Sequence, residues 1–148
     1  MQEHGRRLAD AIEVALPAWV ERSVARRLPE ADAAVRSAAS AAGARAAAEV
    51  GAEVRALLDR DVDRQRTTPL TLLRAAVRYP TEVLREASAP PVVRDREQER
   101  LFPDDVYDLT PATFADVDPA LGDLGLAWGA AKAITHLRRH GAPTGTER

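Results

Sequence analysis

The segment from Ala31 to Ala48 consists almost entirely of residues that favour an α-helix. In and just beyond it, Ala39, Gly43, Ala47 and Gly51 recur at every fourth position, so they share one helical face. Side chains this small let another helix approach closely. The chain is therefore expected to form a helical fold in which this face packs tightly on a second helix, of the same chain or of another copy.

The first 28 residues carry a helical pattern as well. Apolar side chains recur at steps of three and four, which predicts one stripe made of Leu8, Ile12, Ala15, Leu16, Trp19, Val20, Val24 and Leu28. Pro17 removes a hydrogen bond and clashes with the preceding turn, so we expect a kink or a break near Leu16. Acidic and basic residues alternate on the polar side, whereas membrane-surface helices are usually biased basic. The stripe is therefore expected to face a protein core.

Several shorter helices are expected after residue 66. Thr68 can cap a helix that has Pro69 at its first position, and Tyr79-Pro80 ends that helix and can begin another. Thr110-Pro111 and Asp118-Pro119 predict two more starts, each opening a short helix. A final helix is expected from Leu124 to His140, where Gly141 ends it.

These patterns predict an all-α fold. We expect a compact bundle of several helices, one of them long and rich in alanine, with an irregular arm of proline, aspartate and aromatic residues (101–118) packed on it. A chain of this length fits a single domain, placed at residues 1–140. Residues 1–66 would supply the Ala/Arg-rich helices, residues 67–140 the other helices and the arm, and residues 141–148 a flexible tail.

Most of the aromatic side chains lie in the stretch 101–139, which contains Phe102, Tyr107, Phe114 and Trp128. Trp128 has small neighbours and is expected to be buried. The arm is too elaborate for a simple connector, so it either wraps the protein's own helices or presents aromatic rings to a partner. We favour wrapping, with part of the same surface left for recognition. Phe102, Tyr107 and Phe114 are the candidate partner-binding residues.

Three segments of the sequence carry a resemblance to known proteins. They read TTPLTLLRAAVRYPTEVLREA, then FPDDVYDLTPATFADVDPAL, then GLAWGAAKA. Over residues 65–137 the chain resembles a family of short conserved proteins from actinobacteria. That family has no settled activity, so the resemblance implies no mechanism and no catalytic residue.

The sequence offers little for catalysis or for a cofactor. It has no cysteine, no Gly-x-Ser-x-Gly motif and no phosphate-binding loop with lysine. His136 and His140 have a metal-binding spacing, but Arg138 and Arg139 between them repel a cation. The spacing of the aspartates 104, 105, 108, 116, 118 and 123 does not fit a calcium loop, which favours capping and turn roles. We therefore expect a protein that is not an enzyme and holds neither metal nor cofactor.

Two functions remain open. The first is a non-catalytic regulatory or adaptor protein that binds another protein, with a homodimer also possible. The alternative is a helical protein associated with nucleic acid through a surface of Arg60, Arg64, Arg74 and Arg78, although acidic residues interleave with these arginines and the net charge is -2. No apolar run is long enough to span a membrane, and Asp10 and Glu13 interrupt any signal peptide. Together with the missing cysteines, this predicts a cytoplasmic protein.

Overall fold

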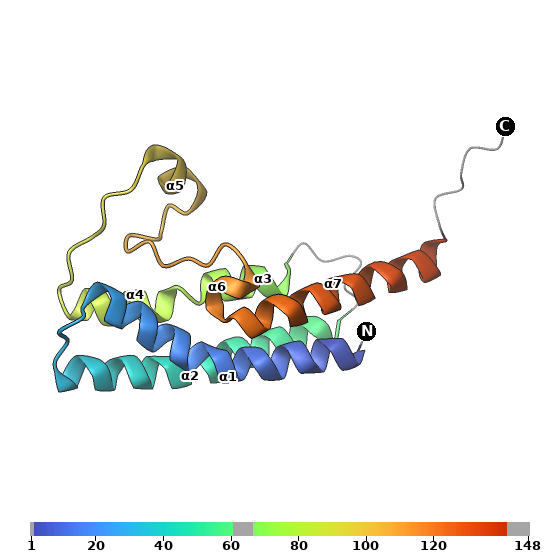
Figure 1. Ribbon diagram of the computed structural model, residues 1–148, viewed down its shortest axis with the longest axis horizontal. Coiled ribbons are helices and arrows are strands. Elements are labelled where there is room, and N and C mark those ends of the chain that lie inside the picture. Colours follow the sequence, from blue (N-terminus) through green and yellow to red (C-terminus); the bar gives the residue numbers. More distant parts are fainter. Residues whose placement is uncertain (1, 61–66, 142–148) are drawn as a thin grey trace.

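The computed structural model describes residues 2–60 and 67–141, and every regular element within these ranges is an α-helix (Figure 1). The all-α fold predicted from the sequence is confirmed. Two long helices, α1 (Gln2–Arg27) and α2 (Ala33–Leu58), run antiparallel along the length of the molecule. Arg64 and residues 142–148 of the predicted tail lie outside the described residues. None of the described helices combines the length and apolar character needed to cross a membrane.

The small face of α2 packs against α1 of the same chain. Ala39, Gly43 and Gly51 are buried and Ala47 is half-buried, so the predicted close contact is confirmed. A Cβ atom added at Gly43 would come within 2.9 Å of both the Cα and the carbonyl oxygen of Pro17. The two backbones therefore nearly touch there. α1 continues through Pro17, so the break considered at this position does not occur.

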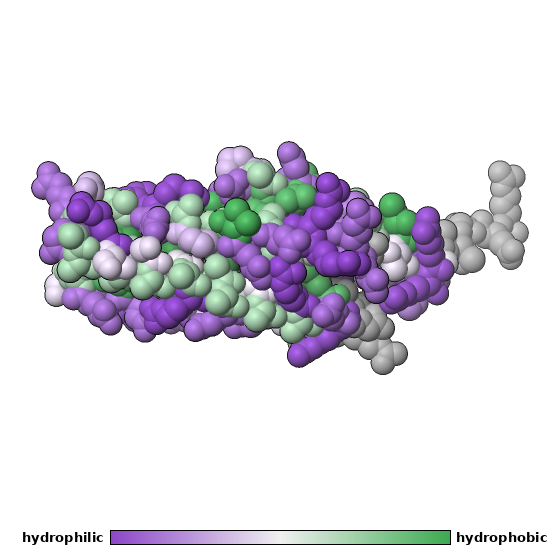
Figure 2. Space-filling model, turned by 90° about the horizontal axis from the view of Figure 1, so that it is seen from below, coloured by the Kyte–Doolittle hydropathy of each residue, from purple (hydrophilic) through white to green (hydrophobic). Residues whose placement is uncertain are grey.

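The opposite side of α2 faces solvent. Its exposed positions are mostly small, including Ala34, Ser37, Ala41, Ala44, Ala48 and Ala52. Figure 2, which views the molecule from below, shows a pale, weakly apolar band along this face, bordered by hydrophilic side chains.

Two short helices follow and close one side of the hairpin. α3 (Pro69–Ala75) begins where predicted, because Thr68 caps it in a reciprocal arrangement with Thr71. α4 (Arg78–Glu86) follows almost immediately and lies against both long helices. Tyr79, Val83 and Leu84 of α4 are buried there.

The last part of the chain comprises α5 (Arg96–Leu101), α6 (Phe114–Val117) and α7 (Pro119–His140). The short helix expected at Thr110-Pro111 starts instead at Phe114, where Thr113 and Asp116 form a capping box. The final helix begins at Pro119 rather than at Leu124. Asp118 caps it by accepting a hydrogen bond from the Ala120 amide at 2.8 Å, so the two segments predicted around Gly122 form one helix.

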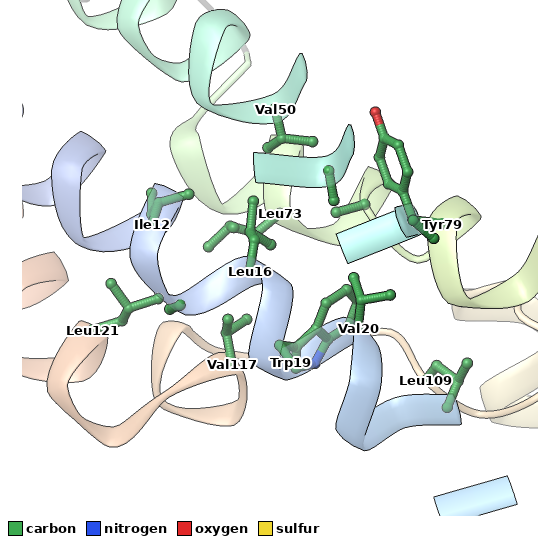
Figure 3. Close-up of a cluster of buried hydrophobic side chains, with 14 of the residues drawn as sticks. Ile12, Leu16, Trp19, Val20, Val50, Leu73, Tyr79, Leu109, Val117 and Leu121 are labelled. Carbon is green, nitrogen blue, oxygen red and sulfur yellow. The ribbon is translucent and has the colours of Figure 1, made fainter. Parts of the chain in front are cut away.

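The core is one continuous cluster of buried apolar side chains (Figure 3). Leu16 and Val20 of α1 belong to it together with Val50 of α2, Leu73 of α3 and Leu121 of α7. Leu109 of the arm and Val117 of α6 belong to the same cluster. Helix α5 has no buried residue, and it projects from the rest of the molecule in Figure 1.

Candidate functional site

The base of the arm (residues 101–118) is held to the bundle by arginines that bind its main-chain carbonyls. Three of them come from the last turns of α1 and one comes from α3. In each bond the guanidinium donates to a main-chain oxygen. Arg22 donates to Val117 (2.6 Å), Arg26 to Asp108 (3.0 Å) and Arg27 to Tyr107 (2.9 Å), and Arg74 donates to both Pro111 (3.3 Å) and Ala112 (2.8 Å). A guanidinium offers several donors in a rigid fork, which suits an irregular segment whose carbonyls have no helical partner.

The inner side chains of the arm point into the protein. Tyr107 is only 3% exposed, and its hydroxyl donates to the Ala89 oxygen at 3.0 Å. Asp105 is equally buried, and its carboxylate accepts from the amides of Leu109 (2.9 Å) and Thr110 (2.7 Å). The arm therefore wraps its own core here. Tyr107 is therefore not accessible to a partner protein, because its ring is buried and its hydroxyl already bonds to Ala89.

The two phenylalanines of the arm are half-buried. The Phe114 ring lies on Gly125 of α7, where an added Cβ would come within 2.5 Å of the ring. The Arg74 guanidinium lies over the Phe102 ring at 5.9 Å from its centroid. Trp128 is buried, as predicted, and the Lys132 ammonium lies 5.4 Å from its ring centroid. Of the three candidate rings, Phe102 is the one that directly follows the exposed helix α5 in the chain.

The segment that precedes the arm and leads into it is a closed loop around α5, which we call the tip (residues 93–102). The Val92 amide donates to the Val106 oxygen at 3.0 Å, and Arg94 donates to the Phe102 oxygen at 2.8 Å. These two bonds join the chain segment that enters the loop to the segment that leaves it. Val93 is 98% exposed and Leu101 is 59% exposed. The tip thus presents apolar side chains on a segment that is closed by hydrogen bonds at its base.

A polar groove of about 510 Å³ lies between α2 and α4. The Tyr79 hydroxyl donates to the Glu49 carboxylate, and Arg78 donates to the Tyr79 hydroxyl at 3.1 Å. Burial raises the pKa of Tyr79, and the bond to Glu49 raises this pKa further. The phenol is therefore neutral near pH 7 and acts as a hydrogen-bond donor rather than a base. Arg45 pairs with Glu82 at 3.6 Å, so the groove is an ion-pair network in which charges balance.

The candidate nucleic-acid surface is not assembled as a basic face among the described residues. Arg60 is exposed, whereas Arg74 binds the arm and Arg78 pairs with Glu53 at 3.3 Å. The Tyr79 hydroxyl raises the pKa of Arg78 by accepting its hydrogen bond, so this guanidinium stays charged but is already engaged. Phosphate binding would have to displace these contacts.

His136 and His140 lie side by side near the end of α7. Their ring centroids are 4.6 Å apart, with the rings tilted by 43°. Within residues 2–60 and 67–141, no three His, Cys, Asp or Glu side chains gather in a way that could hold a metal ion.

The geometry thus singles out the arm, which is bound to the bundle, and the tip that leads into it, which exposes apolar residues. Comparison with protein-family models, with curated proteins and with solved structures gave no match to this chain.

Proposed function

We propose that the protein is a non-catalytic regulatory or adaptor protein of the cytoplasm, and that its tip binds a partner protein. The observation that carries the proposal is the contrast between the buried part of the arm and the exposed tip. Tyr107 and Leu109 are buried, whereas Val93 and Leu101 are exposed on a loop closed by the Arg94 bond.

A held loop suits protein recognition for a physical reason. Ordering a flexible segment on binding costs free energy, and a segment that is already closed avoids much of that cost. The exposed valine and leucine supply apolar surface, and the half-buried Phe102 ring extends it towards the bundle. The charged residues of α5, such as Arg96 and Glu99, would form the polar rim of such a contact.

Affinity capture from a lysate of the source cell tests this proposal. The wild-type chain should capture one protein in a stoichiometric amount, and Val93→Asp combined with Leu101→Asp should abolish the capture without lowering the melting temperature. Val14→Asp is the matched control, because Val14 is 79% exposed on α1, and it should leave capture intact. Capture that survives in the tip variant would refute the tip as the binding surface.

A further inference from the structure

The second half of α7 stands away from the other helices. Its buried residues, Leu121, Gly125 and Trp128, all lie in the first half of the helix. Figure 1 shows its C-terminal end extending past the ends of α1 and α2. Short helices without tertiary packing are marginal in water, because most helical stability in proteins comes from burying an apolar face. A helix that extends this far is best stabilised by a further contact.

The side of α7 that faces away from the bundle is apolar. Leu126 is 75% exposed and Leu137 is 47% exposed, with the exposed Ala130 and Ala133 between them. These residues follow one another at steps of four, three and four, so they form one stripe along the helix. Ile134, which is 50% exposed, lies on its edge. We call these five residues the α7 stripe.

We propose that the α7 stripe binds the α7 stripe of a second copy of this chain, with the two helices antiparallel. The order of side chains is self-complementary. Large leucines lie at both ends and alanines in the middle, so Leu126 of one copy meets Leu137 of the other. Ala130 and Ala133 then face each other near the twofold axis, where small side chains let the helices approach closely.

Charges next to the stripe select the antiparallel arrangement. Asp123 and Arg138 are exposed, lie near opposite ends of the stripe and project from the same flank of the helix. A twofold axis perpendicular to the helices places equal flanks side by side, so Asp123 of each copy faces Arg138 of the other. A parallel pair would instead place the two copies of this flank on opposite sides of the interface, so Asp123 and Arg138 of the two copies would not face each other. Antiparallel helices also oppose their dipoles favourably.

The two bundles would not collide, because each stripe faces away from its own bundle. One pair of helices buries less than the roughly 800 Å² per partner of a standard interface. The dimer is therefore expected to depend on protein concentration. This surface is separate from the tip, so dimerisation and partner capture can fail independently.

Sedimentation velocity over a concentration series, from about 1 μM to about 1 mM, tests the proposal. The wild-type chain should shift from monomer to dimer. Leu126→Asp combined with Leu137→Asp should stay monomeric throughout, and Val14→Asp should dimerise like the wild type. A wild-type chain that is monomeric at every concentration would overturn the proposal, and this is the result expected if another part of the same chain covers the stripe. Dimerisation that survives in the double leucine variant would overturn it as well.

Charge reversal tests the orientation. Asp123→Arg alone and Arg138→Asp alone should each weaken dimerisation by about tenfold, because each creates two like-charge contacts. The double variant exchanges the two charges and should recover most of the loss. Helical content measured on the same samples separates this effect from fraying of α7. If the double variant dimerises no better than the singles while remaining helical, the antiparallel arrangement is refuted.

Discussion

At the scale of single residues, alanine substitutions at two glycines on different helices should change the free energy of unfolding in opposite directions. A Cβ at Gly43 would lie 2.9 Å from backbone atoms of Pro17, whereas a Cβ at Gly129 would meet no heavy atom within 4 Å. Gly43→Ala should therefore force α1 and α2 apart and lower the free energy of unfolding by about 1–3 kcal/mol. Gly129→Ala should raise it by about 0.5–1 kcal/mol, because alanine favours the helix. Urea unfolding of dilute protein measures both. A Gly43→Ala variant as stable as Gly129→Ala would contradict the close contact.

Individual residue roles were only partly predictable from the sequence. Spacing alone identified Gly43 as a site of close helix packing, and Asp118 next to Pro119 marked a helix start. Asp105 is different. Six aspartates lie between residues 104 and 123, and nothing in their order shows that Asp105 is the buried one that binds two amides. That role depends on the path of the arm, which is set by contacts with helices far away in the sequence.

At the scale of elements, the α1–α2 contact has a dependence on pH. The Glu13 side chain crosses Gly51, and its carboxylate accepts a hydrogen bond from Arg55 Nε at 2.8 Å. That bond lowers the pKa of Glu13 below 4.5. Because the folded pKa is the lower one, the stabilisation is complete above pH 4.5 and is lost as the pH falls through the lowered value.

Glu13→Gln should therefore reduce the free energy of unfolding near pH 7 by about 0.2–1 kcal/mol, the size expected for a partly exposed ion pair. The difference from wild type should shrink as the pH falls below 4.5. Urea unfolding across a pH series measures it, with Glu21→Gln on the exposed side of the same helix as the control. A difference that does not change with pH would show that packing rather than charge causes the effect.

Helix boundaries were predictable wherever local chemistry decides them. Thr68-Pro69 begins α3 as expected, and Gly141 ends α7. One expectation was wrong for a tertiary reason: α7 continues past Gly122 and Gly125. At Pro17, where a kink or a break was expected, the helix is not broken, and its backbone packs against Gly43. Gly125 is required because the Phe114 ring covers it, so a residue that suggests a helix end in the sequence serves close packing in the fold.

At the scale of the whole molecule, the sequence indicated that the arm wraps the bundle but not how it is bound. Arg22 and Arg26 are one helical turn apart, which places both on one side of α1. In an arginine-rich chain this spacing is ordinary, and only the folded arm shows that these guanidinium groups bind its carbonyls. The same contacts use Arg74, which the sequence placed on a candidate nucleic-acid surface. The long-range path of the chain therefore decides which arginines remain available.

The continuous core predicts one cooperative unit with two segments outside it. Helix α5 and the second half of α7 bury almost nothing, so their amides should exchange with solvent faster than those of α1 and α2. Hydrogen exchange measured on dilute protein should show both segments as weakly protected.

At high concentration only residues 130–140 of α7 should gain protection, because dimerisation covers the α7 stripe and leaves α5 unchanged. The double leucine variant, Leu126→Asp with Leu137→Asp, should show no gain. Equal protection of α5 and α7 at every concentration would mean that the second half of α7 stays solvated and that its helix needs no second copy.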